Sequence, residues 1–169
     1  MRTLSMMVRA LLVILVMGIT SCGDDKDQLT VEQEAYIKQN KEYIWEKKAQ
    51  KDDNGELAYQ QVIVSTDTAL YRIVKKENDW QSYPTTTSTI TVKDMVGQLI
   101  NGQVFQPKAN AQLKMNSLIP GFAAIMLHVH PDETVEMIIP ANLGYGNMGQ
   151  NGIPIGSTLL FTLTLDKIQ

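Results

Sequence analysis

The stretch from residue 118 to residue 165 limits the possible folds of this chain more than any other. Pro120 and Gly121 mark the start of a helix, because proline has a preset φ and needs no N–H partner in a first turn. An apolar stripe at helical spacing follows, made of Phe122, Ile125, Met126 and Val129. Pro131 and Asp132 predict the end of this short helix.

Two strands and a glycine-rich loop are predicted after the helix. Apolar residues at 135, 137 and 139 alternate along the first strand, and Pro140 ends it because proline has no N–H to donate. The loop runs from Gly144 to Gly156. Leu159, Phe161, Leu163 and Leu165 then alternate with their neighbours, which predicts a second strand with one buried face.

This order of signals resembles the FKBP family, the macrolide-binding peptidyl-prolyl isomerases. The family motif V-I-P-G-W corresponds to residues 118–122, and I-P-x-x-x-A-Y-G corresponds to Ile139-Pro140 followed by Gly144-Tyr145-Gly146. The family tail G-x-I-P-x-x-(S/T)-T-L-x-F corresponds to residues 152–161. The resemblance covers roughly residues 69–169. It implies an α+β fold, in which a strongly curved antiparallel sheet of about five or six strands wraps around the short helix.

The N-terminus predicts a lipoprotein signal peptide over residues 1–22. Arg2 and Arg9 provide the positive start, and the apolar run that follows is shorter than the ~20 residues that span a bilayer. The run ends at Thr20-Ser21-Cys22, which resembles a bacterial lipobox, so Cys22 is the predicted lipidation site. An ordinary signal peptide or an anchor helix with an incidental cysteine is the alternative.

An acidic tether is predicted over residues 23–30. Its Gly-Asp-Asp-Lys-Asp start resembles the surface-export signal of Bacteroidetes lipoproteins, and a plain solvated tether is the alternative. Together with the leader, it predicts a protein of the cell envelope. The protein would be lipid-anchored to the outer membrane, on its periplasmic face or at the cell surface.

Residues 31–55 predict an N-terminal helical extension. Thr30 and Gln33 have the spacing of a capping box, and apolar pairs at 36–37 and 43–44 give one face, so the helix is expected from about 31 to 51. The helix either packs on the core or spaces it from the membrane, with dimerisation as an alternative, and a monomer is expected. Residues 56–68 form a connecting segment with a possible extra strand, and residues 69–169 form the FKBP-like domain.

Composition excludes several function classes. The net charge is −3, and without Arg2 and Arg9 the chain carries 13 basic against 18 acidic groups, which argues against nucleic acid as a partner. A single cysteine excludes an internal disulfide. His128 and His130 lack further ligands at metal spacing, so no metal or other cofactor is expected.

The resemblance implies a substrate pocket and assigns residues to it. The family's catalytic positions are matched by Tyr145, Phe105 and Phe161, and its substrate-binding positions by Leu118, Ile119, Phe122, Ile153, Met95 and Gln106. The backbone N–H of Ile119 and the hydroxyl of Tyr145 would donate the hydrogen bonds that orient the peptide, and Phe122 would underlie the proline ring.

Four positions depart from the family pattern. Met95 replaces a tyrosine, Gln106 an aspartate and Phe122 a tryptophan, and Ala111 falls roughly where a pocket phenylalanine is common. The first hypothesis is therefore a peptidyl-prolyl cis-trans isomerase with a weakened pocket, acting on proline-containing segments of exported proteins. The alternative is a non-catalytic FKBP-fold lipoprotein that binds proline-containing or apolar segments as a chaperone or scaffold.

Overall fold

The computed structural model describes residues 29–78, 81–146, 148–150 and 152–169. The predicted leader, most of the tether and the lipidation site Cys22 lie outside these residues. None of the helices in the described ranges is both long enough and apolar enough to cross a membrane.

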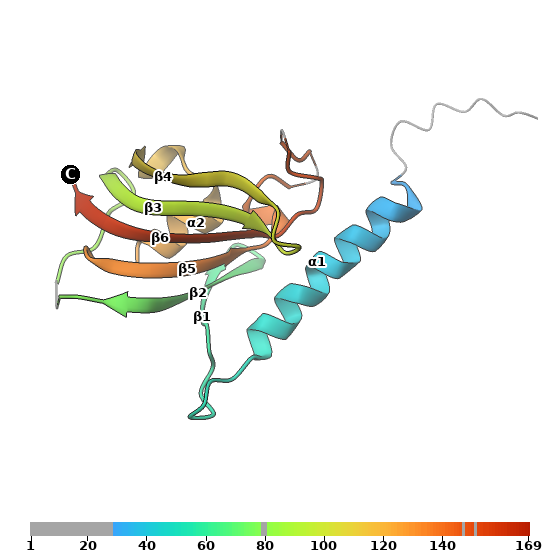
Figure 1. The fold of residues 1–169 in the computed structure, drawn as a ribbon, viewed down its shortest axis with the longest axis horizontal. Helices are drawn as coiled ribbons and strands as arrows, with labels where there is room; N and C mark the ends of the chain where they lie inside the picture. The colour runs from blue at the N-terminus through green and yellow to red at the C-terminus, as the bar shows by residue number, and fades with distance from the viewer. Residues whose placement is uncertain (1–28, 79–80, 147, 151) are drawn as a thin grey trace, which may run out of the picture.

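Six antiparallel strands form one curved sheet in the described part of the chain (Figure 1). In chain order they are β1 Gln60–Val64, β2 Asp67–Lys76, β3 Thr89–Leu99, β4 Val104–Lys114, β5 Glu133–Ile139 and β6 Leu159–Ile168. Their order across the sheet is β1-β2-β5-β6-β3-β4, so the C-terminal strand β6 is central. The sheet curves around helix α2, Pro120–Met126, which confirms the predicted fold class.

Helix α2 begins where the sequence predicts. Pro120 occupies its first turn, and Phe122, Ile125 and Met126 are buried against the sheet. Gly121 is required there, because a Cβ at this position would lie only 2.6 Å from the side chain of Ile139. The predicted end at Pro131 is wrong: the helix stops at Met126. The chain then tightens into i→i−3 hydrogen bonds, such as His128 N to Ile125 O at 2.9 Å.

The predicted strands are present, including the extra strand β1, which pairs with β2. The sequence did not indicate β4, which contains Pro107 and pairs with β3 at the edge of the sheet. A proline is tolerated there because an edge strand has no second neighbour to receive its missing N–H.

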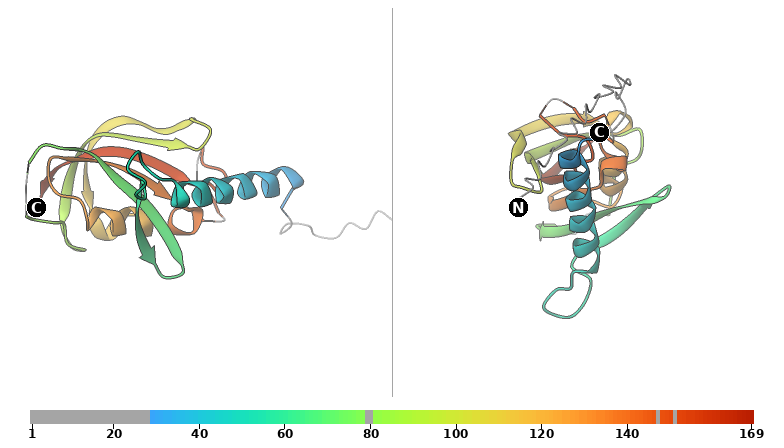
Figure 2. Two further views of the ribbon diagram at one scale, coloured as in Figure 1. Left: turned by 90° about the horizontal axis from the view of Figure 1, so that it is seen from below. Right: turned by 90° about the vertical axis from the view of Figure 1, so that its right-hand side faces the viewer.

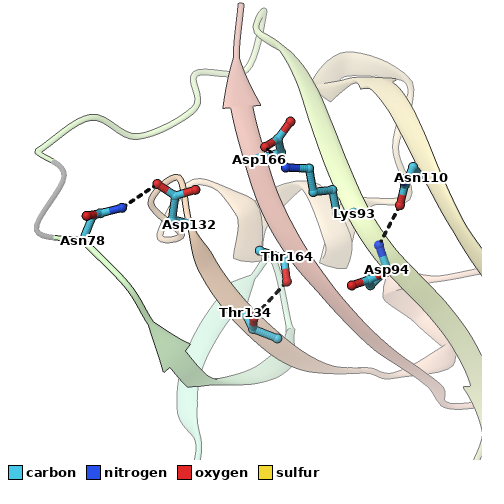
Figure 3. Close-up of polar contacts among 8 residues, drawn as sticks. All are labelled: Asn78, Lys93, Asp94, Asn110, Asp132, Thr134, Thr164 and Asp166. Atoms are coloured by element: carbon cyan, nitrogen blue, oxygen red, sulfur yellow. Dashed lines mark hydrogen bonds and ion pairs between the residues drawn. The ribbon is translucent and has the colours of Figure 1, made fainter.

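The outer face of the sheet carries polar contacts (Figure 3). Thr134 on β5 and Thr164 on β6 share a hydrogen bond of 2.8 Å between their hydroxyls. Lys93 on β3 pairs with Asp166 on β6, and that hydrogen bond raises the pKa of the lysine. These contacts stabilise the convex face, whereas the concave face holds the core around α2.

Helix α1, Val31–Ala49, lies beside the end of the sheet where β6 begins (Figures 1 and 2). The predicted capping box is present: Gln33 N donates to Thr30 Oγ1 at 3.2 Å, and Thr30 N donates to Gln33 Oε1 at 2.8 Å. Tyr43 and Ile44 pack against a small apolar cluster of Tyr59, Leu70 and Ile138. The helix therefore packs on the core, as one of the two predicted roles requires.

Candidate active site

A pocket of about 410 Å³ opens between the sheet, the start of α2 and the loop before β6. The structure places all nine sequence-assigned pocket residues in its lining: Met95, Phe105, Gln106, Leu118, Ile119, Phe122, Tyr145, Ile153 and Phe161. Leu113, Ser117 and Gln150 also line it and were not indicated by the sequence. None of these described lining residues carries a charge.

Three phenylalanines form a continuous aromatic surface, in which Phe122 is the floor of the pocket and Phe105 and Phe161 belong to its sheet wall. The rings of Phe122 and Phe161 meet edge to face with centroids 5.2 Å apart, and those of Phe105 and Phe161 do so at 5.4 Å. Both distances lie in the favourable range for aromatic pairs. Phe122 and Phe161 are buried, so the floor is continuous with the core.

Gly97 on β3 makes room for Phe105. In the sheet, Gly97 lies opposite Gln106 on one side and Phe161 on the other. A Cβ on Gly97 would lie 2.6 Å from Phe105 Cε2 and 2.9 Å from Gln106 Cβ. The absence of a side chain at Gly97 therefore lets the Phe105 ring approach β3 closely, where it meets Phe161 edge to face.

Met95 and Gln106 form the wall where the chain departs from the family. Met95 is buried and contributes a flexible apolar side chain. The amide of Gln106 donates from Nε2 to the neighbouring Pro107 carbonyl at 3.0 Å. This wall therefore presents apolar and neutral groups. Ala111 is half-buried on β4 opposite Val92 and does not line the pocket.

Two hydrogen-bond donors lie on the side of the pocket opposite Met95 and Gln106. Tyr145 follows the short 3₁₀ helix η2, Ala141–Leu143, and Gly146 N donates to Ala141 O at 2.7 Å to close the turn that holds it. The Tyr145 hydroxyl has no hydrogen bond to any residue the structure describes. Ile119 is the N-cap of α2, and its N–H likewise has no partner within the described ranges. Both donors are available to a peptide carbonyl.

A second hollow of about 490 Å³ lies between α1 and the core. It is larger, but it contains none of the nine residues and no phenylalanine floor, so the smaller pocket is the better candidate. The two histidines also lie elsewhere: His128 stacks on Tyr71, and the His130 ring packs on Tyr83. Among the described residues, no group of three potential metal ligands is found.

Comparison with known proteins gives the family of this chain. The family model described as FKBP-type peptidyl-prolyl cis-trans isomerase matches residues 81–166, about half of the chain. The chain belongs to this family. The matched range contains the nine lining residues assigned from the sequence and excludes α1, β1 and β2.

Curated relatives and solved structures extend the likeness. The isomerase FkpA of Buchnera aphidicola subsp. Schizaphis graminum is 30% identical over 63% of this chain and 44% of its own length. FkpA of Escherichia coli K12 is 26% identical over 89% of this chain and 62% of its own length. The chain thus spans less than two thirds of these relatives.

Two solved structures share the fold. An isomerase from Pseudomonas syringae pv. tomato has a TM-score of 0.69 at 19% identity, covering 84% of this chain and 99% of its own. The E. coli FkpA structure has a TM-score of 0.60 at 23% identity, covering 82% of this chain and 60% of its own. At these identities the likeness is one of fold.

Proposed function

We propose that this chain catalyses the cis–trans isomerisation of X–Pro bonds in exported polypeptides. The observation that carries the proposal is the uncharged pocket with its phenylalanine floor and two hydrogen-bond donors, the Tyr145 hydroxyl and the Ile119 N–H, that have no partner within the described ranges. Family membership supports the same activity.

The reaction needs no nucleophile, base or metal. The barrier is amide resonance, about 18–20 kcal/mol, and uncatalysed X–Pro exchange takes tens to hundreds of seconds. A catalyst must bind the twisted amide better than the planar one. Twisting reduces the charge separation of the amide, so an apolar, water-poor pocket favours the twisted form over the planar one.

Each pocket residue has a role in this scheme. Phe122 would underlie the proline ring, while Phe105 and Phe161 would form the wall on the carbonyl side. The Ile119 N–H and the Tyr145 hydroxyl would hold the peptide carbonyls on either side of the twisting bond. Leu118, Ile153 and Met95 would exclude water, and Gln106 would replace a carboxylate with a neutral amide, which reduces polarity at that wall.

The decisive experiment measures isomerisation of a proline peptide by the full chain in mild detergent, with protease-coupled detection. Wild-type protein is expected to accelerate the reaction above background. Tyr145→Phe removes one hydrogen bond, worth about 0.5–1.5 kcal/mol, so kcat/KM is expected to fall about 2–12-fold. Tyr83→Phe is the matched control, because Tyr83 is half exposed and packs on His130 away from the pocket. An inactive wild-type chain would overturn the proposal.

The second candidate is a binding module without turnover. The loss of two family side chains at Met95 and Gln106 favours it. It predicts that proline peptides bind in the pocket, with Tyr145→Phe weakening binding, while the isomerisation rate stays at background.

The proposed location is the cell envelope, with the chain anchored to the outer membrane through acyl chains on Cys22. Two or more acyl chains hold a protein stably on a bilayer, whereas one is marginal. Cys22→Ser is expected to move the protein from the membrane fraction to the soluble fraction. A variant that stays in the membrane fraction with its acyl groups intact would contradict this anchor.

A further inference from the structure

Helix α1 makes a specific contact with the residues just before β6. Asn40 is 1% exposed, and its Oδ1 accepts a 2.7 Å hydrogen bond from the backbone N–H of Thr158. Its Nδ2 donates to Tyr36 O at 2.9 Å, which fixes the amide orientation on the helix. Thr158 Oγ1 completes the contact by donating to Asn40 O at 3.3 Å. The buried Asn40 amide is thus satisfied at both ends: its oxygen bonds across the interface to Thr158, and its nitrogen bonds within α1.

One helical turn earlier on α1, Tyr36 and Ile37 contact Ser157 and Gly156, the two loop residues before Thr158. The Tyr36 hydroxyl lies 2.9 Å from Ser157 Oγ. The Ser157 hydroxyl in turn donates to Pro154 O at 2.6 Å. Ile37 packs directly over Gly156, where a Cβ would lie 2.4 Å from Ile37 Cγ1. The loop therefore fits closely against the helix at residues 156–158.

Residues 156–158 are hydrogen-bonded to the chain neighbours of the loop wall, which is the side of the pocket formed by Tyr145, Gln150 and Ile153. Gly156 N donates to Gly146 O at 3.1 Å, one residue after Tyr145. Pro154, which accepts from Ser157, follows Ile153 directly. Ile153 N also donates to Gln150 O at 2.7 Å, and Gln150 N donates to Ile153 O at 3.0 Å, so these two pocket residues are joined to each other.

We propose that α1 is a positioning element of the isomerase site, and that Asn40 is the positioning residue that sets where Tyr145 and Ile153 stand. The inference rests on the proposed function and adds a role for a helix outside the family match. A donor must be held close to its productive geometry to favour the twisted amide, and a side chain on a loop needs outside support for that precision.

The test is a double-mutant cycle in the full chain, with isomerisation and thermal unfolding measured together. Asn40→Ala is expected to lower kcat/KM about 3–10-fold in the wild-type background, and at most about twofold in the Tyr145→Phe background. The smaller effect of Asn40→Ala in the Tyr145→Phe background is the diagnostic result, because it shows that Asn40 acts through the Tyr145 hydroxyl. Tyr36→Phe, which loses one hydroxyl, serves the same cycle if Asn40→Ala does not fold.

Thr134→Val is the matched control for stability. It removes the hydrogen bond to Thr164 on the outer face of the sheet (Figure 3), and neither threonine lines the pocket. It is expected to lower Tm while leaving kcat/KM unchanged. If Asn40→Ala also lowers Tm without changing kcat/KM, or lowers kcat/KM equally in both backgrounds, the positioning role is overturned.

Backbone amide NMR shifts separate this inference from the proposed function. Asn40→Ala is expected to shift the amides of Tyr145, Gly146 and Ile153 and to leave that of Gly97 in place. An inactive wild type with these shifts would overturn the isomerase proposal but keep the mechanical link. An active wild type without them would overturn the link alone.

Discussion

The two walls of the pocket are held in place by different means. The sheet wall, formed by Met95, Phe105 and Phe161, belongs to three neighbouring strands whose ladders fix each side chain. Among the described residues, the loop wall of Tyr145, Gln150 and Ile153 is held by turn hydrogen bonds and by packing of Tyr145 and Ile153 on the core. The contact of residues 156–158 with α1 supports it from behind. The sheet wall thus lies on strands that the family match includes, namely β3, β4 and most of β6. The second wall depends on a helix that the family match does not include.

Truncations in the sheet wall and the floor are expected to lower the free energy of unfolding more than substitutions in the loop wall. Phe122→Ala removes a buried ring that packs on Phe161, and such truncations cost about 3–5 kcal/mol of folding stability. Chemical unfolding measures this loss, and kcat/KM is expected to fall with it. A loss below about 1 kcal/mol would mean that the ring is not part of the core.

Gly156→Ala probes the loop wall. The residue has φ +72°, a conformation that strains alanine by about 1–2 kcal/mol, and its new Cβ would collide with Ile37. A total loss of about 2–4 kcal/mol is expected, together with lower kcat/KM. Gly102→Ala is the matched control, since Gly102 has φ +83° but open space around its Cβ position. Equal losses in the two variants would show that α1 does not press on the loop.

Gly97→Ala probes the sheet wall without touching the loop. The added methyl group displaces Phe105, and overpacking of this kind costs about 1–3 kcal/mol. The expected result is a moderate drop in Tm, with KM raised more than kcat is lowered, because the wall moves while the Tyr145 donor stays. Unchanged KM for proline peptides would mean that Phe105 does not contact the substrate.

The smallest expected effect is the pH dependence of folding stability that comes from Tyr43 and Tyr59, which lie in the apolar cluster beneath α1. Burial, first among the causes, raises the pKa of Tyr43 and of Tyr59 above 10.0. A folded-state pKa above the unfolded value means that stability is full below pH 10 and declines as the pH rises past it. Tm is therefore expected to fall above about pH 10, and less so in Tyr43→Phe. An identical alkaline loss in that variant would exclude Tyr43 as a contributor.

Sequence patterns predicted the parts of this molecule that depend on local rules. The capping box at Thr30, the start of α2 at Pro120 and the alternation along β5 and β6 are each set by residues close together in the chain. The strand β4 was missed because Pro107 opposes a strand assignment, and only its place at the sheet edge makes it acceptable.

The pocket residues also divide into those that local sequence motifs predict and those that depend on tertiary structure. The family motifs carried nine of the lining residues, but Leu113, Ser117 and Gln150 enter through strand register and loop path, which no local pattern encodes. Asn40 gave no signal, because a polar residue on a helix normally faces water. Its buried position follows from a contact with Thr158, far away in the sequence.

Exchange NMR on a proline peptide with a small amount of the full chain tests the central claim most directly. It follows the cis and trans signals of the same molecule without a coupled protease. Cis–trans exchange is expected to be far faster than the uncatalysed tens to hundreds of seconds, and to be slowed by Tyr145→Phe and by Phe122→Ala. An exchange rate that matches peptide alone, at protein concentrations where the peptide is bound, would contradict it.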